Sequence, residues 1–209
     1  MTRDIWRKSE ATKINCKVFG FQAKESPLAH LLLDNLKGIE IGGSLHNPFC
    51  LNTINIDFTN ESNGYKYEER RLSGGKYLTI DVNASGDKLP FKNETYDFVI
   101  SSHAIEHFYD PIKTINEWFR VIKKNGYIFM IIPHKERTFD KYKNRTTLNE
   151  LLERHKNPKP MKVDLSGHFN VWITEDFIKL CQSQNWKIAA ILDKDDKVGN
   201  GFTFVLQKS

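Results

Sequence analysis

The chain has 209 residues and a mass of 24.4 kDa, which is enough for one α/β domain. Hydrophobic residues make up 39% and aromatic residues 12%, which excludes a disordered chain. No apolar run approaches the ~20 residues of a membrane-spanning helix. The net charge of +5 and the pI near 9.0 raise the question of a nucleic-acid partner.

Cysteine usage and the N-terminal residues indicate a cytoplasmic protein. Cys16, Cys50 and Cys181 are far apart and form no CxxC pair, which argues against both a disulfide framework and a structural zinc site. The first residues lack the apolar segment of a secretory signal. Residues 1–25 are basic and weakly patterned, so we predict an N-terminal arm or cap followed by one domain over residues 26–209.

Helix signals recur from residue 26 onward. Ser26 and Pro27 are typical of a helix start, and this helix is expected to end at Gly38. A second helix is expected to open at Asp110-Pro111 and to close at Asn125-Gly126. Two further helices are predicted at the C-terminal side, one after a capping box at Thr147 and one capped by Thr174.

Short β-branched runs separate these helices and are typical of strands buried on both faces of a parallel sheet. The last two runs are joined by a short polar loop, which predicts an antiparallel hairpin. We therefore expect an α/β fold with a Rossmann-like, doubly wound, seven-stranded sheet, mostly parallel with an antiparallel C-terminal strand. Residues 134–168 interrupt the alternation and are predicted to be an insertion over the carboxyl edge of the sheet. The expected strands are 38–44, 53–57, 77–81, 97–101, 127–132, 187–192 and 202–206.

The ends of the first three strands carry acids and glycines. An open parallel sheet binds its ligand outside the carboxyl ends of its strands. Glycines there allow close backbone approach, and an acid after the second strand is placed to accept hydrogen bonds from a ribose diol. An acid and an apolar neighbour after the third strand could flank an adenine ring. The residues at these ends are Glu40, Gly42, Gly43 and Ser44, then Asp57, then Asp81 and Val82.

These motifs resemble the class I S-adenosylmethionine-dependent methyltransferases of the type 11 family. The similarity is strongest in Leu89-Pro-Phe91, in the run from Asp97 to His107, and in the run from Phe119 to Gly126. Gly167-His-Phe169 resembles the segment near the acceptor site of that family. The resemblance implies S-adenosylmethionine as the cofactor, with S-adenosylhomocysteine as the product.

The resemblance also implies a set of cofactor-binding residues. Ser44 departs from the family pattern, because a second glycine is expected at that position. The insertion resembles those of methyltransferases found beside surface-polysaccharide glycosyltransferases. The expected acceptor is a small hydroxyl-bearing molecule, such as a sugar or a sugar-linked polar group. The implied cofactor residues are Glu40, Gly42, Gly43, Ser44, Asp57, Asp81, Val82, Ser102, His103 and His107.

A hydroxyl acceptor benefits from a general base, and histidine is the natural candidate. His168 and His134 are the predicted catalytic residues, because they lie in the insertion and its return. The run from His103 to His107 also fits the H-x-x-E-H zinc-peptidase pattern, which needs both histidines on one helical face. The same letters occur in the methyltransferase motif, so no metal site is predicted there.

A second possible metal-binding site is suggested by residue type alone. It would use Asp140, His155, Asp164 and His168, whose spacing is not diagnostic, so a solvated polar insertion is favoured.

The basic residues are dispersed and interleaved with acids, so no nucleic-acid groove is predicted. The expected partner is a small-molecule acceptor, and the chain is expected to be a monomer or a homodimer without a membrane span. Two alternatives stay open: an RNA or protein methyltransferase that docks through the basic arm, and a non-catalytic S-adenosylmethionine-binding protein. A NAD-dependent dehydrogenase is disfavoured because the G-x-G-x-x-G spacing is absent.

Overall fold

The computed structural model describes residues 26–43, 49–58, 80–159 and 167–209. Its strands form one seven-stranded sheet in the order β3-β2-β1-β4-β5-β7-β6. Neighbouring strands pair in parallel, except that β7 runs antiparallel to both β5 and β6. The predicted doubly wound sheet and its antiparallel C-terminal strand are thus confirmed. The strands are β1 (Gly38–Ile41), β2 (Thr53–Asp57), β3 (Val82–Asn83), β4 (Tyr96–Ser102), β5 (Ile122–Pro133), β6 (Lys187–Leu192) and β7 (Gly201–Gln207).

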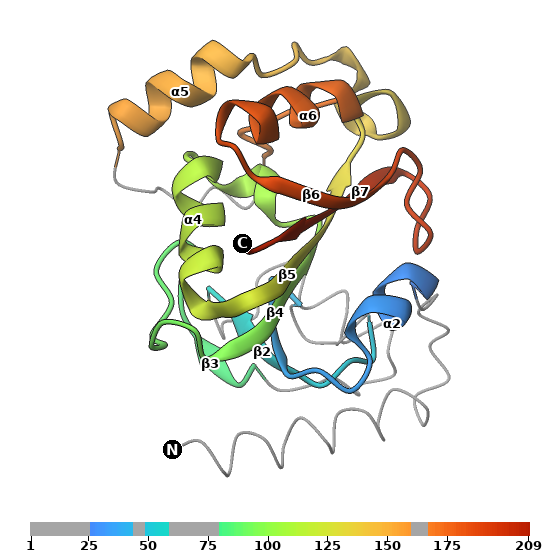
Figure 1. The fold of residues 1–209 in the computed structure, drawn as a ribbon. Coiled ribbons are helices and arrows are strands. Elements are labelled where there is room, and N and C mark those ends of the chain that lie inside the picture. The colour runs from blue at the N-terminus through green and yellow to red at the C-terminus, as the bar shows by residue number, and fades with distance from the viewer. Residues whose placement is uncertain (1–25, 44–48, 59–79, 160–166) are drawn as a thin grey trace.

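Helices cover both faces of the sheet (Figure 1). α4, α5 and α6 pack on one face, and α2 packs on the other. No helix in the described part of the chain is long and apolar enough to cross a membrane. The α-helices are α2 (Pro27–Leu33), α4 (Pro111–Val121), α5 (Leu148–Lys156) and α6 (Thr174–Ser183). The 3-10 helices are η1 (Ile105–His107), η2 (Lys135–Arg137) and η3 (Phe139–Tyr142).

The central strands are apolar on both faces because each face carries its own core. In β4, Val99 belongs to the core beneath α4 and α6, while Phe98 and Ile100 belong to the core beneath α2, and all three are fully buried. β6, at the edge of the sheet, instead alternates between exposed and half-buried residues. Unalternated hydrophobic runs in the sequence therefore identified the strands with two covered faces.

The first helix ends earlier than predicted. α2 begins after the Ser26 cap, as expected, but it ends at Leu33 and the chain turns at Asn35, whose φ is 65°. Gly38 is the first residue of β1 and not a helix stop. A Cβ at this position would lie 2.3 Å from the Phe98 ring, so glycine is needed for the close approach of β1 to β4.

The end of α4 also differs from the prediction. α4 ends at Val121, and Ile122 already has extended backbone with ψ of 150°. Asn125, with φ of 63°, turns the chain within the first part of β5 and does not cap the helix. Asn tolerates this left-handed conformation better than most residues, which explains why its signal was misread as a helix end.

The third strand and the last helix cap need correction as well. β3 begins at Val82, one residue after the predicted strand ends, and residues 77–79 of that prediction lie outside the described ones. Thr174 is the first residue of α6, and its hydroxyl donates a 2.5 Å hydrogen bond to Asp193. Asp176 instead accepts from the backbone N–H of Ile173 at 3.2 Å. The capping box at Thr147 is confirmed.

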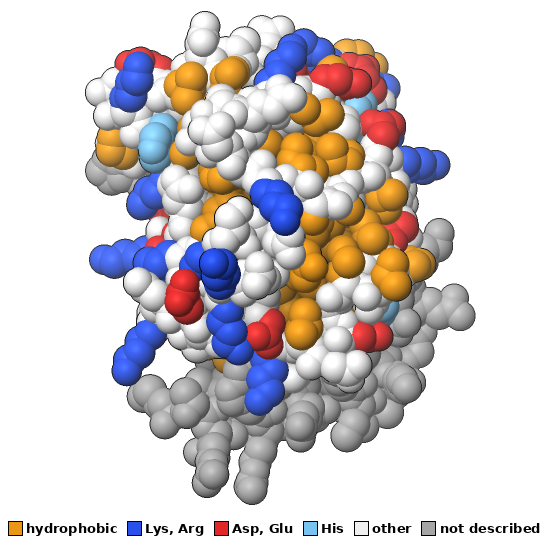
Figure 2. Space-filling model, viewed as in Figure 1, with side chains coloured by type: hydrophobic (Ala, Val, Ile, Leu, Met, Phe, Trp, Pro, Cys, Tyr) orange, Lys and Arg blue, Asp and Glu red, His pale blue; other side chains and the backbone are white. Residues whose placement is uncertain are grey.

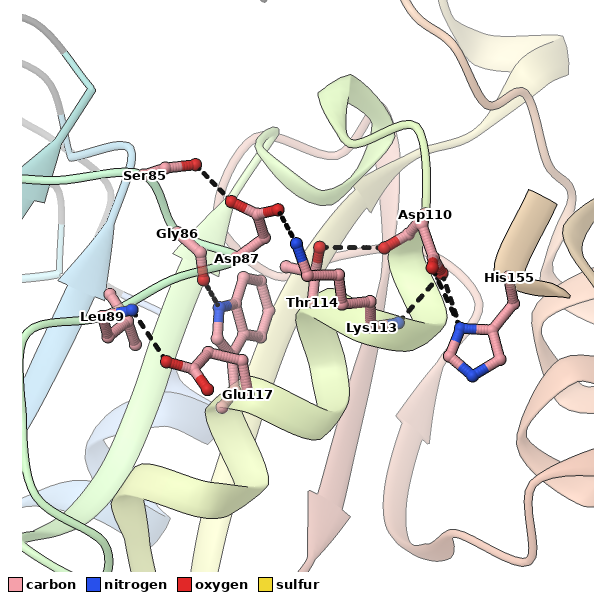
Figure 3. Close-up of polar contacts among 10 residues, drawn as sticks. Ser85, Gly86, Asp87, Leu89, Asp110, Lys113, Thr114, Glu117 and His155 are labelled. Carbon is pink, nitrogen blue, oxygen red and sulfur yellow. Dashed lines mark hydrogen bonds and ion pairs between the residues drawn. The ribbon is translucent and has the colours of Figure 1, made fainter. Parts of the chain in front are cut away.

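Side-chain hydrogen bonds fasten the segment before β4 to α4 (Figure 3). The Lys113 ammonium contacts the Asp87 carboxylate at 2.7 Å, and the backbone N–H of Leu89 donates to Glu117 at 2.7 Å. These bonds connect the segment around residues 87–89, at the start of the predicted 89–91 motif, to the helix that follows β4.

A second group of contacts holds the N-terminus of α4 (Figure 3). Asp110 accepts a 2.9 Å hydrogen bond from the backbone N–H of Lys113, and Pro111 occupies the first turn. The Nδ1 atom of His155, on α5, lies 2.9 Å from the same carboxylate. Since β4 and α4 are both fixed, the connection between them, residues 103–110, is held at its two ends.

Candidate cofactor and acceptor site

The carboxyl end of β1 carries a buried acid and two glycines. Glu40 is 1% exposed, and burial raises the pKa of its carboxyl well above the usual value, with Lys197 opposing the shift. Gly42 has φ of 70°, and a Cβ there would lie 3.1 Å from Cβ of Ala104. A side chain at this position would be strained, so the backbone is left bare where the first strand ends.

Gly43 follows in equally tight surroundings, because an added Cβ would lie 2.7 Å from Oδ1 of Asn55. Ser44, the departure from the family pattern, lies outside the described residues.

The two other strand-end acids differ in their surroundings. Asp57 is the half-buried last residue of β2. Asp81 lies beside β2, where its carboxylate accepts from the backbone N–H of Asn55 at 3.0 Å, and its own N–H donates to the Asn55 carbonyl at 2.9 Å. Val82, the first residue of β3, then pairs with Ile56 of β2. The structure thus brings Asp57, Asp81 and Val82 to one edge, with Asp81 also bracing the sheet.

The end of β4 approaches the same edge. Ser102 is its last residue, and His103 follows with φ of 51° and donates its backbone N–H to the carbonyl of Ile131 at 2.9 Å. The Nε2 atom of His103 is buried and has no hydrogen-bond partner among the described residues. Burial lowers the pKa of this histidine, and Asp195 opposes the shift.

The H-x-x-E-H pattern does not form the arrangement of a zinc peptidase. Since His103 lies in a left-handed turn and η1 spans only Ile105–His107, the histidines at 103 and 107 do not share a helical face.

The loop between β6 and β7 adds two groups that the sequence did not predict. The Asp195 carboxylate accepts hydrogen bonds of 2.6–3.1 Å from four backbone N–H groups, donated by Lys197, Val198 and Gly199 in the loop and by Gly201 at the start of β7. Burial would raise the pKa of Asp195, but these donors hold it below its usual value. Burial lowers the pKa of Lys197, whereas Glu40 and Asp195 raise it.

Lys197 therefore brings a cation to the Glu40 end of β1. Its Nζ atom also lies 5.4 Å from the centroid of the Phe49 ring. The loop was expected to be a plain hairpin turn, and only its run of polar residues could have indicated more.

A histidine–carboxylate cluster, composed of Glu106, His107, Asp140 and His168, lies near His103, which interacts electrostatically with both of its histidines. Nδ1 of His168 lies 2.5 Å from Oδ2 of Asp140, whose other oxygen is 2.7 Å from Lys143 Nζ. Nε2 of His168 and Nε2 of His107 each lie 3.8 Å from Oε1 of Glu106. The rings of His107 and His168 meet edge to face with centroids 4.9 Å apart.

Glu106 is the most deeply buried member of this cluster. It is fully buried, and burial raises the pKa of its carboxyl to about 8, with Asp140 adding to the shift. Burial also lowers the pKa of His107. Glu106 was quoted in the sequence motif but not predicted as a site residue.

The two predicted catalytic histidines are not brought together by these contacts. Nδ1 of His134 accepts from the backbone N–H of Glu136 at 3.1 Å and caps η2, and its ring meets Phe202. Burial lowers the pKa of His134, and Arg137 adds to this shift. His134 thus fixes the chain after β5, whereas His168 is part of the histidine–carboxylate cluster.

The structure does not bring together the four residues of the second possible metal-binding site. Asp140 and His168 meet, but His155 pairs with Asp110, and Asp164 lies outside the described residues.

Known proteins resemble this chain in sequence over its central part. Residues 43–130 match a family described as a methyltransferase domain. An uncharacterized protein of Methanocaldococcus jannaschii is 35% identical over 97 residues, which cover 45% of this chain and 43% of that protein. An uncharacterized methyltransferase of Bacillus subtilis is 21% identical over 173 residues, which cover 81% of this chain and 65% of that protein. The chain thus spans less than two thirds of either relative.

Solved structures share the fold over nearly the whole chain. A methyltransferase of Aquifex aeolicus that depends on S-adenosylmethionine superposes with a TM-score of 0.57 at 15% identity, covering 94% of this chain and 97% of its own. Another from Thermotoga maritima gives a TM-score of 0.53 at 19% identity, covering 98% and 100%. The described residues on both sides of the matched segment therefore belong to the same fold as in these proteins.

Proposed function

Because the chain carries a methyltransferase domain of the class I S-adenosylmethionine-dependent family, we propose that it methylates a small hydroxyl-bearing acceptor, such as a sugar or a surface-polysaccharide precursor. The observation that carries this proposal is the convergence of two groups at one edge of the sheet. Acids and glycines lie at the ends of neighbouring parallel strands, and His103, which follows β4, interacts electrostatically with Lys197 and Asp195 and with His107 and His168 of the histidine–carboxylate cluster.

The strand ends are proposed to hold the cofactor, S-adenosylmethionine, which supplies an activated methyl group when bound. Asp57 would accept hydrogen bonds from the ribose hydroxyls, and the bare backbone at Gly42 and Gly43 would allow the cofactor to lie against β1. Asp81 and Val82 would flank the adenine, and Glu40 would face the cofactor from the end of β1. Ser44, Ser102, His103 and His107 complete the proposed set.

The histidine–carboxylate cluster is proposed to act on the acceptor. As the new O–CH₃ bond forms and the S–CH₃ bond breaks, the acceptor hydroxyl must lose its proton, and a positioned group accelerates this step. We place His168 first in this role, because Asp140 fixes its ring through Nδ1 and leaves Nε2 on the inner side of the cluster. His134 is the second candidate, with Nδ1 already used by the backbone of η2.

A small polar acceptor suits the chemistry of this side of the site. The buried side chains here are carboxylates and imidazoles, which form hydrogen bonds with hydroxyl groups. On the face drawn in Figure 2, Lys and Arg side chains are interspersed with acidic ones and do not form one continuous stripe. A dispersed charge supports a small acceptor over RNA.

A transfer assay with methyl-labelled S-adenosylmethionine tests this proposal. Sugars and nucleotide sugars, tRNA and a protein mixture are offered as three acceptor classes. We expect label in a hydroxyl-bearing small molecule, inhibition by S-adenosylhomocysteine, and loss of transfer in Asp57→Ala but not in Asp97→Asn, which alters an acid at the opposite edge of the sheet. Label only in tRNA or in protein would contradict the proposed acceptor.

A further inference from the structure

We propose that Glu106, His107 and His168 form a binding site for one divalent transition-metal ion, with Zn²⁺ as the probe. One ligand atom from each residue lies within 4.8 Å of the others, and Glu106 Oε1 is 3.8 Å from both Nε2 atoms. Zinc binds imidazole nitrogen and carboxylate oxygen at about 2.0–2.2 Å, so its ligand atoms are separated by roughly 3.3–3.5 Å. Glu106 Oε1 would have to approach each Nε2 atom by roughly 0.3–0.5 Å, and the two imidazole nitrogens, which lie within 4.8 Å of each other, by at most roughly 1.5 Å.

Both histidines are oriented as metal ligands usually are. A metal-bound imidazole commonly donates its other ring N–H to a carboxylate or a backbone carbonyl, which fixes the ring and its tautomer. Nδ1 of His107 lies 3.0 Å from the carbonyl of Gly167, and this nitrogen must be the donor because a carbonyl only accepts. Nδ1 of His168 contacts the Asp140 carboxylate, itself paired with Lys143. In both rings, Nε2 is left to face Glu106.

The Glu106 carboxylate lacks the partners that a buried acid needs. It is fully buried, and neither of its oxygens accepts a hydrogen bond from another described residue. The 3.8 Å separations from the two imidazoles are too long for hydrogen bonds. Leaving a buried polar group unsatisfied is costly, and a cation held between the carboxylate and the two rings would remove this cost.

Backbone contacts hold the two halves of the site together. The carbonyl of Glu106 accepts from the backbone N–H groups of Phe169 at 3.0 Å and Asn170 at 3.1 Å. The side chain of Asn170 donates to the Phe108 carbonyl at 2.6 Å. The segment that carries His168 is therefore fastened to the segment that carries Glu106 and His107, although about 60 residues separate them.

The ligand set indicates the class of ion. Two imidazoles and one carboxylate suit zinc and its neighbours in the first transition row, whereas Mg²⁺ and Ca²⁺ prefer oxygen ligands. Three protein ligands also leave a coordination position open. With the ion on Nε2 of His168, the ion at that open position, and not the imidazole, would assist loss of the acceptor proton. The His107 side chain is 26% exposed and provides the route from solvent, since Glu106 and His168 are buried more deeply.

Calorimetric titration of Zn²⁺ into the chelator-treated chain, without S-adenosylmethionine, tests the site directly. We expect one equivalent to bind, and Co²⁺ in its place to give the absorption bands of a nitrogen- and oxygen-ligated ion. His168→Ala and Glu106→Gln should each weaken binding at least about 100-fold, and Asp140→Asn about 10–100-fold. His155→Ala, which alters a histidine outside the site, should bind as the unchanged chain does.

Substoichiometric binding, or binding that His168→Ala and Glu106→Gln both leave unchanged, would overturn the proposal. Should Glu106→Gln fail to fold, His107→Ala gives the same test at the most exposed ligand. Because the titration needs neither cofactor nor acceptor, its outcome does not depend on the proposed transfer reaction.

Discussion

The cofactor edge and the histidine–carboxylate cluster are built in different ways. The acids and glycines of the cofactor edge come from the ends of β1, β2 and β3, so the register of the parallel sheet sets their positions. The cluster takes its members from η1, from η3 and from the segment after residue 166, which meet only through loops and backbone hydrogen bonds. The sheet therefore makes the first region predictable from sequence, while the second depends on tertiary contacts.

The largest expected effect is on stability, and it comes from comparing a glycine of the sheet with a glycine beside the cluster. Gly38→Ala should lower the free energy of unfolding by about 3 kcal/mol, because the new Cβ would lie 2.3 Å from the fully buried Phe98 ring. Gly167→Ala should change it by less than about 0.5 kcal/mol, since nothing lies within 4 Å of an added Cβ there. Urea denaturation of both variants measures the difference, and equal losses would show that the sheet does not impose the tighter constraint.

Substitutions in the two regions should also affect different functions, cofactor binding in one and methyl transfer in the other. Asp57→Ala should weaken binding of S-adenosylmethionine by about 1–3 kcal/mol, the range for losing a partner of buried polar groups. His168→Ala should leave this affinity within about twofold while slowing transfer by about 10²-fold or more, as expected for loss of acid–base help. Calorimetry and the transfer assay test this pair. Unchanged affinity in Asp57→Ala would show that the ribose assignment is wrong.

A pH-dependent effect is expected at the loop that brings Lys197 to the cofactor edge. Because its folded-state pKa is depressed, Asp195 stabilises the fold above its unfolded-state pKa of about 3.9, and this contribution is lost as the pH falls through the lower folded-state value. Asp195→Asn should therefore lower the free energy of unfolding by about 1–3 kcal/mol at pH 7. The difference in free energy of unfolding between this variant and the unchanged chain should become smaller below pH 4. Thermal unfolding between pH 7 and pH 3 measures this, and a constant gap would rule out the carboxylate as its source.

The smallest effect is expected on the cluster side, at the cap of α5. Thr147→Ala removes the hydroxyl that accepts from the backbone N–H of Glu150 and should cost about 1 kcal/mol of stability. Affinity for S-adenosylmethionine should not change, because α5 packs mainly against α4 and α6 and carries none of the proposed cofactor-binding residues. A parallel loss of cofactor affinity would mean that the two regions are more closely coupled than their contacts indicate.

The sequence predicted the parts of the fold that follow from local rules. Strands with two covered faces, such as β4 and β5, appeared as unbroken apolar runs. Ser26, Asp110 and Thr147 marked helix starts through their capping chemistry. Helix ends were misjudged where a residue served another purpose: Gly38 admits Phe98, and Asn125 turns a strand. These roles depend on tertiary contacts that no local pattern carries.

The same limit applies to the candidate site. The strand-end residues Glu40, Asp57 and Asp81 were predicted because strand ends in a parallel sheet share one edge. Lys197 and Glu106 were not predicted, because their roles depend on their surroundings in the folded chain. Lys197 is buried beside Glu40, and Glu106 faces two imidazoles. The H-x-x-E-H letters did contain Glu106 and His107, but their significance appears only when His168 joins them from elsewhere in the chain.

Calorimetric titration of the chain with S-adenosylmethionine, S-adenosylhomocysteine and NAD tests the central claim most directly. We expect both adenosyl ligands to bind at a single site with affinities better than millimolar, each displacing the other, and NAD to give no specific heat. Absence of binding by either adenosyl ligand at millimolar concentration, or saturable binding of NAD in their place, would contradict the assignment of the strand ends to S-adenosylmethionine.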